Sequence, residues 1–136
     1  MEHLGHGINR RRLLNNYIVA YSADEESRAA LDTLLMAVRE DIQYWDRRHP
    51  FLALHDFSEV DLSNELREAT GRIAACYADQ FFGRYAIVVS YTARNRAVAY
   101  LENMHQQRLA RTFDGSFFHN LDLAMQWLKE GIPVGV

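Results

Sequence analysis

The stretch from Pro50 to Leu66 constrains the fold more than any other part of the chain. It begins with four consecutive apolar residues, Phe51 to Leu54, and polarity begins at His55. A continuous apolar run of this kind is typical of a strand that is buried on both faces of an α/β sheet. Because open α/β sheets bind ligands beyond the carboxyl ends of their strands, the polar residues that follow are candidates for a functional site. They are His55, Asp56, Ser58, Asp61 and Ser63.

The length of 136 residues suits one domain with one hydrophobic core. We expect a single α/β domain over residues 13–131, a loose tail over residues 1–12 and a C-terminal tail over residues 132–136. Apolar residues form 49% of the chain, which excludes disorder, and no apolar run approaches the roughly 20 residues of a membrane span. The single cysteine permits no internal disulfide, and the first residues do not resemble a secretory signal. We therefore expect a cytoplasmic protein.

Strand and helix patterns alternate along the rest of the chain. Strands are expected at Tyr17 to Tyr21, Phe51 to His55, Tyr85 to Tyr91 and Leu109 to Phe113, and a short hairpin partner before the first strand is left open. Helices are expected from a capping box at Ser22 and Glu25 to His49 before Pro50, from Asp61 or Ser63 to a stop at Gly83, from Thr92 to Met104, and from Leu121 to an end at Gly131, with Asp114-Gly115 as a turn. The predicted fold class is α/β, with a four-stranded, mostly parallel or mixed sheet and four helices that alternate with the strands.

The charged residues give only weak information about partners. The formal net charge of −3 argues against a general nucleic-acid binder. Arg10, Arg11 and Arg12 form a basic triplet on the expected tail. Such a run is usually solvated, with binding to nucleic acid or to an acidic partner as the alternative.

Two segments carry a family resemblance. LALHDFSEVDLS, from Leu52 to Ser63, consists of an apolar strand, an acidic turn and a serine-bearing helix start. RTFDGSFFHNLDLAMQWLKE, from Arg111 to Glu130, has a strand with Phe113 and then Ala124, Trp127 and Leu128 in its helix. Both segments resemble the STAS-like fold of anti-sigma-factor antagonists and sulfate transporter tails, especially its small stand-alone branch. The resemblance covers about Tyr17 to Glu130.

The resemblance implies a non-enzymatic regulatory or protein-interaction module that acts through the loop and helix start after the second strand. In signalling members a partner kinase phosphorylates a Ser or Thr at this helix start, and Ser63 corresponds to it. This chain departs from the pattern because Leu62 separates Asp61 from Ser63 and no glycine follows the serine. The candidate partner-binding or phosphoacceptor residues are Asp56, Ser58, Asp61 and Ser63.

Other interpretations of the same residues stay open. A small-ligand or lipid carrier would use a pocket lined by His55, Tyr77, Phe81, Tyr91 and Arg94, since relatives of the broader fold include lipid-binding forms. A small hydrolase would use His55 as a general base that Asp56 orients, although no triad motif accompanies them. Turn and helix-cap chemistry also explains the Asp and Ser residues.

We expect neither a cofactor nor a metal site. The six histidines show no paired spacing, and the glycines form no phosphate-binding loop. The expected partner is a protein, with a small apolar ligand or a homodimer as alternatives. No nucleic acid and no membrane span are expected.

Overall fold

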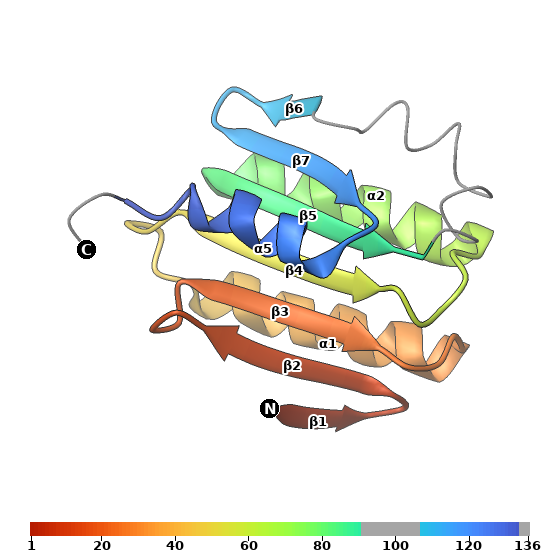
Figure 1. The fold of residues 1–136 in the computed structure, drawn as a ribbon. Coiled ribbons are helices and arrows are strands. Elements are labelled where there is room, and N and C mark those ends of the chain that lie inside the picture. Colours follow the sequence, from red (N-terminus) through yellow and green to blue (C-terminus); the bar gives the residue numbers. More distant parts are fainter. Residues whose placement is uncertain (91–106, 134–136) are drawn as a thin grey trace.

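The computed structural model describes residues 1–90 and 107–133. Within these ranges the chain forms one seven-stranded sheet with the strand order β1-β2-β3-β4-β5-β7-β6 (Figure 1). The strands are β1 (Glu2–Gly5), β2 (Ile8–Leu13), β3 (Ile18–Ala23), β4 (Phe51–Phe57), β5 (Gly83–Val89), β6 (Gln107–Ala110) and β7 (Phe113–Phe118). The helices within the same ranges are α1 (Arg28–Tyr44), α2 (Asn64–Gln80) and α5 (Leu121–Lys129).

The centre of the sheet is parallel and its edges are antiparallel. β3, β4, β5 and β7 pair in parallel, and β1, β2 and β6 add antiparallel strands at the two edges. The predicted α/β class is confirmed, but the prediction of four strands and four helices is wrong, because the described residues form seven strands and three helices. The helix expected from Thr92 to Met104 lies outside the described residues.

The segment expected to be a loose tail, residues 1–12, forms β1 and most of β2. β2 pairs with β3, so the hairpin partner that the sequence left open is present. A charged segment can belong to the sheet because the charge of Arg10 is paired. Its buried guanidinium lies 2.9 Å from the carboxylate of Glu2 and 3.3 Å from that of Asp41 in α1. Because the triplet is charged, the sequence pattern did not predict this strand, although its alternate residues face α1.

The start of α1 also differs from the predicted capping box at Ser22 and Glu25. Ser22 lies in β3, which continues to Ala23 because β2 and β4 pair with it on both sides. The cap is Ser27, whose hydroxyl accepts a hydrogen bond of 3.1 Å from the backbone N–H of Ala30. The cap of α1 therefore lies five residues after Ser22, at the first serine beyond the end of β3.

Asp114-Gly115 does not form the predicted turn. Both residues lie within β7, where Asp114 pairs with Arg84 and Gly115 with Tyr85 of β5. A Cβ atom at Gly115 would lie 2.8 Å from a methyl carbon of Leu109, so a larger residue there would require the Leu109 side chain to shift. The expected strand from Leu109 to Phe113 thus corresponds to the end of β6, the connection and the start of β7.

Helices cover both faces of the sheet. α1 and α2 lie on one face and α5 on the other (Figure 1). The larger core cluster lies between the sheet and α1 and α2, and includes Phe51, Phe57 and Tyr77. The smaller cluster lies under α5 and includes Leu52 and Leu54. Ile132, which was assigned to the C-terminal tail, packs against this smaller cluster.

Candidate functional site

His55 lies inside the core and not beyond the end of its strand, because β4 continues to Phe57. Its side chain is fully buried on the face that α2 covers. Its Nε2 atom lies 3.2 Å from the hydroxyl of Tyr77, and its Nδ1 atom lies 2.7 Å from the hydroxyl of Tyr85. A neutral imidazole has one donor and one acceptor, so these two hydroxyls satisfy the ring.

The surroundings of His55 do not suit a general base. Burial lowers the pKa of His55 to about 3, so the ring is neutral in the folded protein near pH 7. Neighbouring residues of a strand point to opposite faces, and Asp56 accordingly lies on the face that carries α5. The interpretation that Asp56 orients His55 for hydrolysis is therefore wrong.

The buried histidine predicts a loss of stability in mild acid. Because its folded pKa of about 3 lies below the ordinary value of 6.5, the unfolded chain binds this proton first. The stability contribution is complete above pH 6.5 and declines as the pH falls towards 3. Between pH 7 and pH 5 we expect a loss of about 2 kcal/mol, at roughly 1.4 kcal/mol per pH unit.

Urea unfolding of the wild type and of His55→Phe at pH 7, 6 and 5 measures this effect. Other groups titrate in both proteins, so the relevant quantity is the difference between their free energies of unfolding. That difference should move by about 2 kcal/mol in favour of the variant as the pH falls. The same pH dependence in both proteins would contradict a buried neutral histidine.

The structure separates the four candidate residues of the β4–α2 connection. Asp56 and Ser58 form a turn, in which Asp56 Oδ1 accepts hydrogen bonds from the backbone N–H of Ser58 at 3.0 Å and from its hydroxyl at 2.6 Å. Ser63 lies at the start of α2, and its hydroxyl accepts from the backbone N–H of Leu66 at 3.1 Å. The carbonyl of Asp61 accepts from the backbone N–H of Ser63 at 3.1 Å. Ser63 is thus a helix cap, on the opposite face of the sheet from Asp56.

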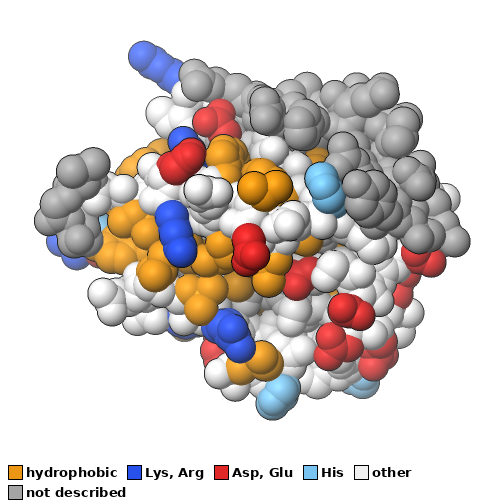
Figure 2. All heavy atoms as spheres, in the orientation of Figure 1, with side chains coloured by type: hydrophobic (Ala, Val, Ile, Leu, Met, Phe, Trp, Pro, Cys, Tyr) orange, Lys and Arg blue, Asp and Glu red, His pale blue; other side chains and the backbone are white. Residues whose placement is uncertain are grey.

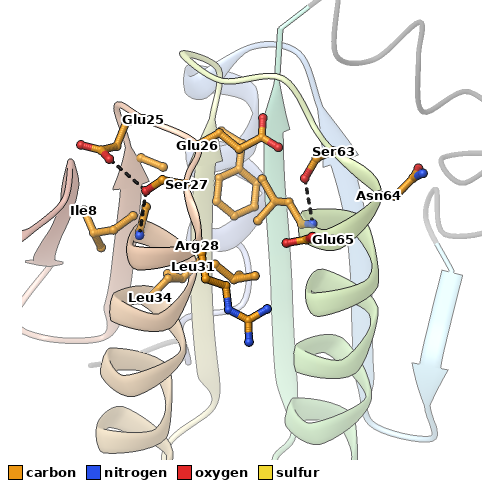
Figure 3. A pocket seen from close by; sticks show the side chains of 14 residues that line it. Ile8, Glu25, Glu26, Ser27, Arg28, Leu31, Leu34, Ser63, Asn64 and Glu65 are labelled. Atoms are coloured by element: carbon orange, nitrogen blue, oxygen red, sulfur yellow. Dashed lines mark hydrogen bonds between the residues drawn. The ribbon is translucent and has the colours of Figure 1, made fainter.

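A cavity of about 370 Å³ lies between the starts of α1 and α2, near the carboxyl ends of β3 and β4 (Figure 3). We call it the helix-start groove. Its floor is apolar, and its rim consists of residues at and before the two helix starts. The floor residues are Ile8, Ala23, Ala30, Leu31, Leu34, Phe57 and Leu66, and the rim residues are Glu25, Glu26, Ser27, Arg28, Ser63, Asn64 and Glu65.

The rim of the groove is predominantly acidic. Glu25, Glu26 and Glu65 contribute three carboxylates, whereas Arg28 contributes one guanidinium. Glu25 accepts a hydrogen bond of 2.9 Å from the hydroxyl of Ser27, which itself caps α1 (Figure 3). Sequence reasoning identified Ser63 at this site but missed the contribution of α1. The signal was the second serine, Ser27, preceded by two glutamates.

The residues proposed for a ligand pocket do not gather around an open cavity. His55 and Tyr77 are fully buried, and Phe81 is nearly so. Phe51 packs between the last two, with ring centroids 4.6 Å from Tyr77 and 4.4 Å from Phe81. These three candidates are therefore core residues. Tyr91 and Arg94, which were assigned to the same pocket, lie outside the described residues.

Residues 1–90 and 107–133 contain no group of three or more His, Cys, Asp or Glu side chains placed to hold a metal ion. In the same ranges no helix has both the length and the apolar composition needed to cross a membrane.

The mixed sheet with helices on both faces defines an α/β class of fold. The chain is similar over most of its length to the crystal structure of an uncharacterised protein of the DUF3478 family, with a SpoIIAA-like fold, from Shewanella loihica PV-4. The two chains are 19% identical with a TM-score of 0.58, and the similarity covers 94% of this chain and 98% of the other. The similarity shows the fold and confirms the expected STAS-like architecture. No protein-family model and no curated protein matches the sequence.

Proposed function

We propose that the protein is a non-enzymatic interaction module of the STAS-like type, which binds a protein partner through the helix-start groove. The observation that supports this function is the combination of an apolar floor with a polar rim at two helix starts. Protein-binding surfaces have an apolar centre surrounded by a polar rim. The groove also includes Ser63, the position at which the resemblance places the regulatory serine.

The charge of the rim indicates the chemistry of the partner. Three carboxylates against one guanidinium give the groove a negative potential. Complementary charge selects partners and speeds their association. We therefore infer a partner surface that places an apolar side chain over the floor and a Lys or Arg against the rim.

Ser63 is the candidate phosphoacceptor of this module. Its hydroxyl lies beside the free N–H groups of the α2 start, where a phosphate is favoured. A phosphate adds a charge of about −1.5 to −2. Because the rim is already acidic, modification would deepen its negative potential and change partner affinity while leaving the fold intact.

Reversal of one rim charge tests this proposal. The partner is first captured with the wild-type protein and identified by mass spectrometry, and its affinity is then measured by calorimetry. Glu26 is exposed and precedes the cap of α1, so Glu26→Lys should leave the melting temperature unchanged. We expect this substitution to weaken the complex by about tenfold or more, because it places a positive charge against a basic partner.

Glu68→Lys is the matched control, since Glu68 is exposed on α2 but does not line the groove. This variant should bind the partner as the wild type does. Equal affinity of the wild type and Glu26→Lys for the partner would show that the groove rim is not part of the interface. Equal loss of affinity in Glu26→Lys and Glu68→Lys would show that only the overall charge of the protein matters.

A further inference from the structure

The arginine triplet divides between the two faces of the sheet. Arg10 and Arg12 both pair with Asp41 of α1, at 3.3 Å and 2.9 Å. Because side chains alternate along a strand, Arg11 points to the opposite face, beside α5. Arg11 is exposed, and it has no ion pair with any residue of the described ranges. One cation of the triplet is therefore available to a ligand.

Arg11 lines a cavity of about 310 Å³ on this face. α5 covers β4, β5 and β7 but leaves β2 and part of β3 open (Figure 1). Hydrophobic side chains gather around α5 on this face (Figure 2). We call this cavity the α5-side pocket. Its apolar residues include Leu13, Ala20, Leu54, Leu121 and Met125.

The lining of this pocket also includes a carboxylate. Asp56 lines it, two residues further along β4 than Leu54 and opposite Ser22 of β3. Its Oδ1 atom accepts both hydrogen bonds from Ser58, whereas Oδ2 has no hydrogen bond to another residue in the described part of the chain. Asp56 and Arg11 do not pair with each other. The lining of the pocket thus combines the guanidinium of Arg11 and the carboxylate of Asp56 with apolar side chains.

We propose that the α5-side pocket binds a small zwitterion with an apolar body, the chemistry of an apolar amino acid or a dipeptide. Arg11 would donate hydrogen bonds to the ligand's carboxylate, and Asp56 would accept one from its ammonium group. The apolar body would lie on Leu54, Ala20 and Met125. A pair of opposite charges that do not neutralise each other favours a ligand that carries both, because a singly charged ligand leaves one of them unmatched.

The size of the pocket supports a small molecule. Ligand pockets span roughly 300 to 1,000 Å³, and this one lies at the lower end. The inference does not rest on the proposed function, because the helix-start groove lies on the face of α1 and α2. Loss of ligand binding at one cavity would leave the other unaffected.

Calorimetric titration of the full chain with four probes tests the proposal. L-Leucine and L-leucyl-L-leucine carry both charges, 4-methylpentanoate lacks the ammonium group, and 3-methylbutan-1-amine lacks the carboxylate. We expect at least one zwitterion to bind tenfold or more tightly than both singly charged probes. Whether leucine or the dipeptide binds more tightly distinguishes the free amino acid from the peptide.

Two substitutions test whether Asp56 binds the ammonium group of the ligand and Arg11 binds its carboxylate. Asp56→Asn should abolish the preference for the zwitterion over 4-methylpentanoate, and it retains the oxygen that Ser58 contacts. Arg11→Gln should abolish the preference over 3-methylbutan-1-amine. Arg39→Gln and Asp32→Asn make the same changes at exposed positions of α1 and should bind as the wild type does. The proposal fails if neither zwitterion binds saturably, if 4-methylpentanoate binds the wild type as tightly, or if both pocket variants retain the wild-type preferences.

Discussion

Replacement of Gly83 by alanine is expected to lower the free energy of unfolding by about 2 to 6 kcal/mol, the sum of a backbone cost and an overpacking cost. Gly83 begins β5 between β4 and β7, and its φ of +142° is a conformation that side-chain-bearing residues rarely adopt. A Cβ atom there would overlap the carbonyl oxygen of Phe51 and lie 2.7 Å from its backbone nitrogen. Backbone atoms at the centre of a sheet cannot move aside as a flexible side chain does.

Gly5→Ala is the control for this substitution. Gly5 also has a positive φ, +101°, but no atom lies within 4 Å of a Cβ placed on it. It therefore isolates the backbone cost, and we expect a loss of only about 1 to 2 kcal/mol. Urea unfolding of both variants measures the difference. Equal losses would show that the close approach of β4 and β5 at Gly83 is not as tight as the structure has it.

Removal of the Asp41 carboxylate is the second substitution with a large expected effect. Asp41 is buried on α1, where it pairs with Arg10 and Arg12 and accepts a hydrogen bond from the Tyr21 hydroxyl. Asp41→Ala leaves a buried guanidinium and a buried hydroxyl without this partner. Breaking a buried ion pair from one side costs about 3 to 5 kcal/mol. We expect the lower end, because Arg10 retains Glu2.

Glu40→Ala is the matched control, since Glu40 pairs with the same guanidinium at 3.0 Å but is largely exposed. An exposed pair contributes about 0 to 1 kcal/mol, so this variant should unfold close to the wild type. Denaturant unfolding distinguishes the two, and hydrogen exchange locates the damage. We expect Asp41→Ala to lose amide protection first in β1 and β2. A loss of stability no greater than that of Glu40→Ala would mean that the cluster does not hold the N-terminal hairpin on α1.

Local pattern in the sequence was sufficient for the elements at the centre of the fold. The apolar run from Phe51 to Leu54 predicted a buried strand, and the spacing of apolar residues predicted α1, α2 and α5, because each signal lies within one or two turns of chain. Ser63 was one of two residues predicted to start the helix after β4, and the structure shows that it is the cap. These elements, with the quoted segments, were enough for the resemblance to the STAS-like fold.

The antiparallel strands were harder to predict from the sequence. β1 and β6 are edge strands of four residues each, and an edge strand is paired on one side only and tolerates charge, so it lacks the apolar run of a central strand. β2 pairs with both β1 and β3 but carries three consecutive arginines, two of which pair with Asp41 of α1. Gly115 was predicted to lie in a turn because glycine is common in turns, but it lies within β7.

Sequence by itself determined the buried central strand and the amphipathic helices, which depend on neighbours within a few residues. Only the tertiary structure decided where the candidate site residues lie.

His55 is a core residue because the hydroxyls of Tyr77 and Tyr85, 22 and 30 residues away, form hydrogen bonds with its two ring nitrogens. Asp56 and Ser63 were separated because alternation along β4 and the path to α2 place them on opposite faces of the sheet. Arg11 was separated from Arg10 and Arg12 because Asp41 lies on one face only. Each of these outcomes depends on pairing between distant segments, which no local pattern contains.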